Sequence, residues 1–276
     1  MRFALVDGTP ATSIPIDDRA LHYGDGLFET IAVRAARPEF LSYHVERLAR
    51  GIEALAIPPQ HPDVLEREVA TAATKLGEGT LKLIVTRGSA ERGYRAPQHA
   101  RPRRLLLGYE PASLPPSWLS EGVRVRMCST RLGHQPRLAG LKHLNRLEQI
   151  LARSEWQDPT IAEGLMMDEA DNVICATSAN LFVVRGRELA TPRVDRAGVA
   201  GVMRRVVLEL AVRDGLTVAE RTVQRSELLD ASELMLSNSV IGLWRVRELE
   251  GRMFSDEAMW RRLSTAIAAC GGRSPE

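Results

Sequence analysis

The spacing of apolar residues predicts two amphipathic helices early in the chain. In residues 42–57 the apolar positions recur every three or four residues, and Ser42 suits the N-cap. A second helix is expected over residues 61–76, where Pro62 falls in the first turn. The flanking stretches are typical of strands: residues 2–8, a hairpin over 27–41 that turns at 34–38 and continues at Phe40 and Leu41, and then 81–88 and 103–110.

Proline interrupts the pattern after Tyr109. The stretch EPASLPPSW, residues 110–118, has three prolines in nine residues and no apolar period. Because proline removes a backbone donor and fixes φ, we expect neither a helix nor a central strand here. The sequence therefore predicts a small N-terminal domain over residues 1–109, a proline-rich linker over 110–121 and a larger C-terminal domain over 122–276.

Strands and helices are also mixed in the second half. Strand-like runs occupy residues 123–129, 179–186, 216–223, 232–238 and 243–249, and 163–174 is typical of a hairpin turning near Asp171. Helices are expected over 143–156, 201–215 and 256–272, the second ending at Gly215. The predicted class is α+β (mixed α/β) in two domains.

Composition narrows the classes of partner. The net charge is +2 and aromatic residues make up only 5%, which does not favour nucleic acid or an anionic membrane; the basic run at 101–104 leads straight into a strand. No run approaches the roughly 18 apolar residues of a membrane span, and no signal peptide is recognisable. The three cysteines form no CxxC pair, and the histidines have no metal-ligand spacing. We expect a cytoplasmic protein without a metal site.

Lys142 lies in AGLKHLNRLEQ, just before the start expected for a helix. A lysine at a helix end is ordinary, but a lysine that forms an imine needs its amine held in place. Two further stretches suit an anion: AGVAGVMRR, a glycine-containing loop opening a helix, and SNSVIG after a strand. Together with Arg47 they predict an imine-forming lysine and a phosphate cup, which is what pyridoxal phosphate requires.

With these motifs in view, the chain resembles the fold-type-IV pyridoxal-phosphate enzymes, a group that includes branched-chain and D-amino-acid aminotransferases. Within the group it is most similar to the aminodeoxychorismate lyases, over essentially its full length. Motifs shared across the fold type are DDRALHYGDGLFET, YHVERL and SANLF, whereas RGSAERGY and LAGLKHLNRLEQ are lyase-like. KLIVTRG, RLGHQPR, TPRVDRAGVAGVMR and SNSVIG extend the likeness.

The resemblance implies a role for each matching position. Lys142 would carry the cofactor as a Schiff base, and Arg47 would bind its phosphate with a planar fork of donors. The backbone N–H groups of Val202 and Met203 would meet the phosphate at a helix start, with a second loop at Asn238 and Ser239. The resemblance also implies a homodimer with each site near the subunit interface, and a cofactor in the cleft between the two domains.

The implied reaction converts 4-amino-4-deoxychorismate to 4-aminobenzoate and pyruvate. Lys142 would act both as Schiff base and as proton carrier. Thr30 is a candidate to relay a proton to the departing enolpyruvate, or else a strand residue facing the core. Since the substrate has two carboxylates, Arg87 and Arg92 are candidates to bind them; the alternative is that they are loop arginines in solvent.

One position departs from the pattern of the fold type. Where the resemblance implies a glutamate at the pyridine nitrogen of the cofactor, this chain has Cys175. A thiol does not keep that nitrogen protonated, so either another acid (Asp168, Glu169 or Asp171) reaches it or the ring is a weaker electron sink. A weaker sink disfavours a D-amino-acid or branched-chain aminotransferase, because aromatisation helps only the lyase. A third alternative, a non-catalytic pyridoxal-phosphate-fold binding protein, is disfavoured by Lys142 and the phosphate cup.

Overall fold

The computed structural model describes residues 1–271 of the chain, which divides into two compact units. Unit 1 comprises Met1–Ser113 together with Leu141–Asn145, and unit 2 comprises Leu114–Gly140 and the chain from Arg146 onward. The final residue of the helix expected over 256–272 lies outside the described residues. Lys142 therefore belongs with the N-terminal strands, although most of its sequence neighbours belong to unit 2.

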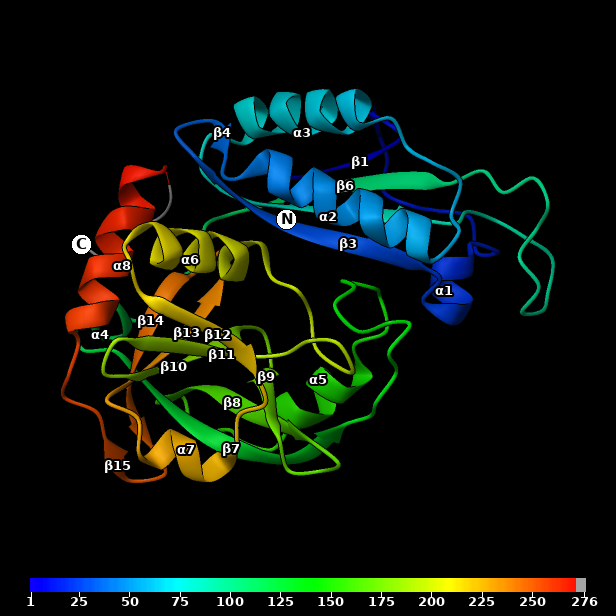
Figure 1. Ribbon diagram of the computed structural model, residues 1–276. Helices are drawn as coiled ribbons and strands as arrows, with labels where there is room; N and C mark the ends of the chain where they lie inside the picture. The colour runs from blue at the N-terminus through cyan, green and yellow to red at the C-terminus, as the bar shows by residue number, and fades with distance from the viewer. Residues whose placement is uncertain (272–276) are drawn as a thin grey trace. The chain divides into compact units, whose positions relative to one another are not determined.

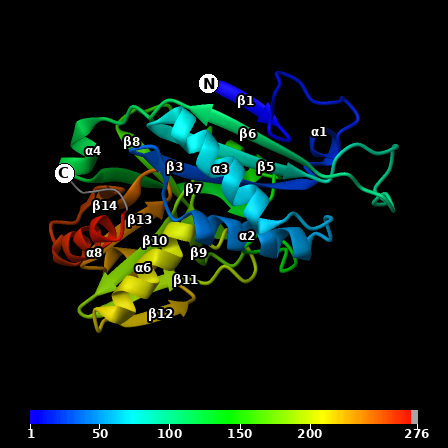
Figure 2. The same cartoon turned by 90° about the horizontal axis from the view of Figure 1, so that it is seen from above.

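Unit 1 is an antiparallel six-stranded sheet with the order β2-β1-β6-β5-β3-β4 (Figure 1). The strands are β1 (Phe3–Val6), β2 (Thr9–Pro10), β3 (Gly26–Arg34), β4 (Arg37–Pro38), β5 (Gly79–Thr86) and β6 (Arg103–Tyr109). Two helices, α2 (Leu41–Ala54) and α3 (Pro62–Leu76), lie side by side on one face of the sheet (Figure 2). The short helix α1 (Arg19–Tyr23) precedes β3.

Strand β3 presents different chemistry on its two faces, because successive side chains of a strand alternate. Leu27, Glu29 and Ile31 face α2: a Cβ on Gly51 of that helix would come within 2.8 Å of the Leu27 side chain. Phe28 and Thr30 occupy the opposite face, and Thr30 pairs with Lys82 of β5. The face away from the helices thus has a hydroxyl, an aromatic ring and an amine.

Unit 2 is a nine-stranded mixed sheet with the order β12-β11-β10-β13-β14-β7-β8-β9, and β15 pairs with β14. Its strands are β7 (Val123–Leu132), β8 (Ile161–Asp168), β9 (Val173–Ala176), β10 (Asn180–Arg185), β11 (Glu188–Pro192), β12 (Thr217–Arg221), β13 (Glu233–Asn238), β14 (Gly242–Leu249) and β15 (Arg252–Met253). Its helices are α4 (Pro116–Ser120), α5 (Leu147–Arg153), α6 (Val202–Arg213), α7 (Arg225–Leu229) and α8 (Ala258–Ala269).

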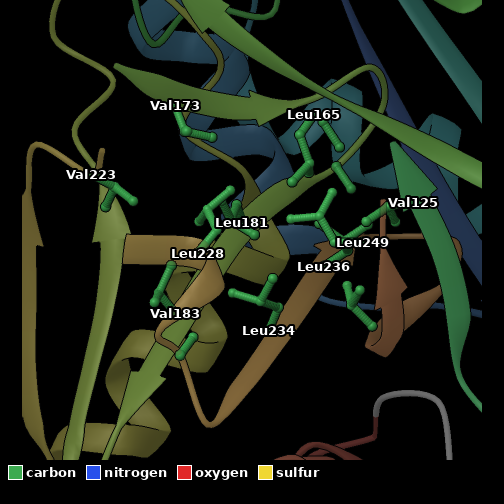
Figure 3. Packing of buried hydrophobic residues seen from close by; sticks show 14 of the residues in the cluster. Val125, Leu165, Val173, Leu181, Val183, Val223, Leu228, Leu234, Leu236 and Leu249 are labelled. Atoms are coloured by element: carbon green, nitrogen blue, oxygen red, sulfur yellow. The ribbon is translucent and has the colours of Figure 1, made fainter. Parts of the chain in front are cut away.

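The core of unit 2 is built from aliphatic side chains of many strands. Figure 3 shows Leu181 and Val183 of β10 with Leu234 and Leu236 of β13, whose side chains lie among residues of the neighbouring strands. Helices α6 and α8 pack against β13.

Some local predictions were wrong. The proline-rich stretch, expected to have no helix, contains α4, with Pro115 at the N-cap and Pro116 in the first turn, where a missing N–H costs little. Trp118 of α4 packs edge-on against Trp244, with 5.4 Å between ring centroids. The second strand of the first hairpin stops at Pro38, and α2 begins at Leu41, where a strand had been expected. The N-cap of α2 is Phe40 and not the predicted Ser42.

The helix expected from His143 also begins later, at Leu147. The residues before it run beside β3 instead: the N–H of Phe28 donates to the Lys142 carbonyl at 2.9 Å, and Leu144 N–H donates to Gly26 at 3.0 Å. The backbone of β3 therefore holds Lys142, and the helix that follows begins only at Leu147. Among the described residues, no helix has the length and apolarity to cross a membrane.

Candidate active site

Lys142 and Lys82 both lie against one aromatic ring in unit 1. The Lys142 Nζ is 4.3 Å from the centroid of Phe28, and the Lys82 Nζ is 5.1 Å from the same centroid. The backbone of Phe28 also holds the Lys142 carbonyl, as described above. A cation over a ring face is attracted by the ring quadrupole. Phe28 thus fixes the lysine by both its backbone and its side chain.

Thr30 lies on the same face of β3 as Phe28 and is half-buried. It therefore faces away from the core between the sheet and α2, which argues against the alternative of a residue packed in that core. Lys82, which the sequence analysis missed, stands directly opposite Thr30 in the sheet register. The alternation of β5 was the available signal, since a lysine within a buried strand run is unusual.

Arg47 is buried on α2 and pairs with Glu29 of β3. Its Nε donates to Glu29 Oε1 at 2.8 Å, and its Nη2 donates to the other oxygen. His44 contacts the same carboxylate through Nδ1 at 2.5 Å. Burial alone would raise the pKa of Glu29, but the charges and hydrogen bonds of Arg47 and His44 outweigh it and lower the pKa to about 2. Glu29, also missed from the sequence, therefore orients the Arg47 guanidinium as a charged partner.

In unit 2 the start of α6 is suited to an anion. Gly201 is its N-cap, with no side-chain cap and no acidic residue in the first turn among the described residues. The N–H groups of Val202 and Met203 belong to the first turn, where no intrahelical acceptor exists. A Cβ on Gly201 would come within 2.1 Å of Asn180 Oδ1, and Asn180 Nδ2 donates to Val199 at 2.9 Å. Asn180 thus fixes the loop that leads into this helix.

The side chain of Asn238 forms hydrogen bonds inside the second predicted phosphate loop. Its Oδ1 accepts hydrogen bonds from Val240 and Ile241 at 2.9 and 3.0 Å, and its Nδ2 donates to Ser178 at 3.1 Å. Ser239 lies half-buried in this turn. Since Ser178 and Asn180 are two residues apart, the start of β10 ties both predicted phosphate loops to one segment. This brings Val202, Met203, Asn238 and Ser239 into a single set of connected loops.

Cys175 is buried in β9, opposite Met166 of β8. Burial, with the charge of Glu163, raises the pKa of the Cys175 thiol to about 12, so the thiol is neutral at physiological pH. The three acids considered from sequence lie in or beside the turn that follows β8, and Asp168 is engaged there by Asn172 and His134. Glu163, not considered from sequence, is the carboxyl with the larger electrostatic effect on Cys175, and Glu148 adds to it.

Glu163 of β8 is buried and holds the segment between β9 and β10 by hydrogen bonds. It accepts hydrogen bonds from the hydroxyls of Thr177 and Ser178 and from the Thr177 N–H at 3.1 Å. Burial raises the pKa of Glu163 despite these donors. Its contacts indicate that it supports the turn that places Ser178 and Asn180.

The two arginines considered for substrate carboxylates differ in setting. Arg87 is buried: its Nε and Nη2 donate to Asp25 at 2.7 and 3.0 Å, and it also donates to the carbonyls of Leu55 and Ala56. Arg92 is exposed, in the loop between β5 and β6. The contacts of Arg87 favour a structural role over either a substrate contact or a solvated loop arginine.

Comparison with known proteins identifies the family of this chain. Residues 26–249 match the family model described as Amino-transferase class IV. An aminodeoxychorismate lyase of Vibrio harveyi is 37% identical over 239 residues, covering 86% of this chain and 88% of that protein. A putative branched-chain-amino-acid aminotransferase of Methanocaldococcus jannaschii is 27% identical, covering 88% of this chain and 85% of the relative.

Solved structures have the same fold. The crystal structure of 4-amino-4-deoxychorismate lyase from Pseudomonas aeruginosa superposes with a TM-score of 0.93 at 45% identity, covering 96% of this chain and 98% of that chain. The Escherichia coli branched-chain aminotransferase, at 21% identity, has a TM-score of 0.85 and covers 96% and 93% of the two chains. The α+β, fold-type-IV class predicted from the sequence is confirmed.

Proposed function

The chain belongs to the class IV aminotransferase family, whose enzymes depend on pyridoxal 5'-phosphate, and from that membership we propose that it converts 4-amino-4-deoxychorismate to 4-aminobenzoate and pyruvate. The geometry that supports this proposal best is the placement of Lys142 on the face of β3 shared by Thr30 and Lys82. The named lyase relatives support the same reaction.

The residues present fit the cofactor. The uncapped start of α6 offers the N–H groups of Val202 and Met203 to a phosphate, and the turn at Asn238 and Ser239 is tied to the same segment. Arg47, oriented by Glu29, would supply the cationic donor. Lys142 would hold the cofactor covalently at rest, and the bound cofactor supplies an electron sink beside the carbon that carries the substrate nitrogen.

Lys142 and Thr30 divide the proton transfers in this proposal. The Lys142 amine accepts the proton from the substrate carbon bearing nitrogen. The bond between the ring and the enolpyruvyl oxygen then breaks, and the substrate ring becomes aromatic. The Thr30 hydroxyl, on the same face of β3, relays this proton from the Lys142 ammonium to the departing enolpyruvate, which becomes pyruvate, so both side chains return to their starting state. No external oxidant or amino acceptor is needed for this balance.

Lys82 is our proposed ligand for one substrate carboxylate, with Arg92 for the other. Lys82 stands opposite Thr30 and shares the Phe28 ring with Lys142, so its charge lies on the reacting face of the sheet. Arg92 is exposed in the loop that follows β5. Arg87 has its donors engaged by Asp25 and two carbonyls, so we no longer assign it to the substrate.

We further propose that the protein acts as a homodimer in the cytoplasm on this small-molecule substrate. Helix α5 exposes Leu147, Ile150 and Leu151 by 73%, 58% and 61%, at helical spacing, and an apolar face of this kind favours burial by a second copy. The cysteine pattern suits a reducing compartment. Neither nucleic acid nor a membrane belongs to this proposal.

An aminotransferase is the second candidate, because an aminotransferase is named among the relatives. The deciding assay supplies 4-amino-4-deoxychorismate without any 2-oxo acid. The lyase releases 4-aminobenzoate and pyruvate together, and Lys142→Ala abolishes both, whereas Lys75→Ala, beside the Phe3 ring, leaves them unchanged. Product formation that depends on an amino acceptor would replace the lyase with the aminotransferase. A cofactor-loaded protein inactive in both assays would favour the binding protein.

A further inference from the structure

Helix α1 and its flanks hold the first part of the loop between β5 and β6. We call residues 88–94 the Arg92 loop. Arg19 N–H donates to Gly88 at 3.0 Å, Ala90 N–H donates to Asp17 at 3.3 Å, and the Ser89 hydroxyl donates to Asp17 at 2.7 Å. The loop is therefore paired along its first residues before it reaches Arg92.

Arg19 holds the backbone that follows Arg92. Its Nη1 donates to the Gly93 carbonyl at 2.8 Å and its Nη2 to the Tyr94 carbonyl at 3.3 Å. Its Nε donates to Asp25 at 2.7 Å, and the side chain is buried. One guanidinium thus joins a carboxylate at the start of β3 to two consecutive carbonyls of the loop. A lysine has no such fork and would not hold all three acceptors at once.

Asp25 keeps this arginine in place and is itself held by Arg87. Burial alone would raise the pKa of Asp25, but hydrogen bonds and charges from Arg87 and Arg19 outweigh it and lower the pKa. Tyr23 completes the contact: its hydroxyl accepts the Gly93 N–H at 3.1 Å, and its ring lies 5.5 Å from that of Tyr94. The Arg19 guanidinium lies over the Tyr23 ring, 4.9 Å from its centroid.

We propose that Arg19 and Tyr23, the α1 clamp, are positioning residues for Arg92: they fix the backbone on its C-terminal side so that an exposed arginine meets a substrate carboxylate with little ordering cost. The inference rests on the role proposed above for Arg92. A long arginine on an unheld loop loses rotamer and backbone freedom when it binds, and that loss weakens binding. The clamp removes the backbone part of the loss before substrate arrives.

The test measures the order of the Arg92 loop separately from catalysis. Arg19→Lys keeps a positive charge beside Asp25 but loses the forked guanidinium donors. Tyr23→Phe keeps the ring but loses the hydroxyl that accepts the Gly93 N–H. The matched control is Arg34→Lys, because Arg34 pairs with Glu39 elsewhere in unit 1. Amide hydrogen exchange of residues 89–95 is measured without substrate, and KM and kcat are measured with it. We expect exchange about tenfold faster and KM about three- to tenfold higher in Arg19→Lys, with kcat within about twofold of the parent. Tyr23→Phe should show smaller changes of the same sign.

Exchange in Arg19→Lys that equals the exchange of Arg34→Lys overturns the clamp. Faster exchange with an unchanged KM overturns its role in substrate binding. Neither result bears on the proposed reaction, because that is judged by whether the parent protein forms 4-aminobenzoate. An Arg92→Ala variant with the parent KM would overturn the substrate contact itself, whatever the exchange of the loop.

Discussion

Lys142 is held by Phe28 at two points: the Phe28 N–H donates to the lysine carbonyl at 2.9 Å, and the lysine Nζ lies 4.3 Å from the ring centroid. The backbone contact survives any side-chain change, so Phe28→Leu removes only the ring. A cation–π contact contributes about 0.5–2 kcal/mol, and we expect kcat to fall by about threefold to tenfold while the folded state persists.

Phe3→Leu is the matched control for this prediction. Its ring carries Lys75 Nζ at 4.8 Å from the centroid, in the same unit but away from Lys142. Steady-state kinetics of both variants decide the matter. If the two substitutions change kcat equally, the ring of Phe28 has no particular part in placing the proton carrier.

Lys82 and Arg87 should respond in opposite ways to the loss of charge. Lys82→Met keeps the length of the side chain and its packing on Phe28, so we expect KM to rise about tenfold or more with little change in stability. Arg87→Met leaves Asp25 and the carbonyls of Leu55 and Ala56 with a lost donor, so we expect it to lower the free energy of unfolding by about 3–5 kcal/mol. Kinetics and urea unfolding on both variants test the contrast. A destabilised Lys82→Met with an unchanged KM would reverse our assignment of the two cations.

Helix periods and strand alternation could be predicted from the sequence because each depends on neighbouring residues. The helices over α2, α3, α6 and α8 follow their apolar spacing. The setting of Lys142 could not be predicted, since it depends on the pairing of Phe28 with a residue more than a hundred positions later. Glu29 was missed for the same reason, because its partners lie on α2. The alternation of β5 singles out Lys82, but its place opposite Thr30 depends on the pairing of the strands.

The two predicted phosphate loops show which features a local motif predicts and which it misses. The glycine before α6 indicated a helix start, and the structure has one at Val202 without a side-chain cap; the anion site there stays a prediction. The sequence held no sign that Asn180 would fasten that loop, or that the side-chain amide of Asn238 would be used to build its own turn. Those contacts arise from strand order, which places β10 beside β13.

Glu29 predicts a pH dependence of stability. Its pKa in the folded state is about 2, below the ordinary value of 4.5, so its contribution is present above pH 4.5 and is lost as pH falls toward 2. Burial lowers the pKa of His44, so His44 adds a loss of the same sign below its ordinary 6.5. Glu29→Gln removes the buried carboxylate charge that faces Arg47 and should cost about 3–5 kcal/mol at pH 7.

Urea unfolding from pH 7 to pH 3 measures both parts of this prediction. The free energy of unfolding of Glu29→Gln should fall less steeply with acid than that of the parent. Thr74→Val, on the exposed face of α3, changes no ionisable group, so it is the control and should keep the parent slope. Parallel curves for the Glu29 variant and the parent would contradict the ion pair.

Gly201→Ala should weaken cofactor binding. A Cβ there would come within 2.1 Å of Asn180 Oδ1, so either the loop before α6 or the asparagine must move. Such overpacking costs about 1–3 kcal/mol, and we expect the affinity for pyridoxal phosphate to fall about tenfold or more. Gly133→Ala, whose Cβ would lie 3.4 Å from Glu148, should bind normally. Fluorescence titration of the cofactor-free proteins measures both, and equal affinities would remove the α6 start from the proposed phosphate site.

Cys175→Glu tests whether the residue at this position sets the choice of reaction. The resemblance places position 175 at the pyridine nitrogen, and burial raises the pKa of the native thiol to about 12, which leaves a neutral group there. A glutamate would favour a protonated ring nitrogen and a stronger electron sink, with Arg146 nearby to favour its charged form. We expect a shifted cofactor absorption band and a higher rate of transamination from D- or branched-chain amino acids.

The control is Cys270→Glu, at the exposed end of α8, which should keep the parent band and the parent side activity. Thermal unfolding shows whether Cys175→Glu is destabilised, because a larger side chain in a filled core costs about 1–3 kcal/mol. A folded Cys175→Glu protein with the parent spectrum and no added transamination would mean that the thiol does not limit the electron sink. Transamination that rises while 4-aminobenzoate formation stays within about twofold would instead show that the lyase reaction needs little from the ring nitrogen, as expected when aromatisation drives it forward.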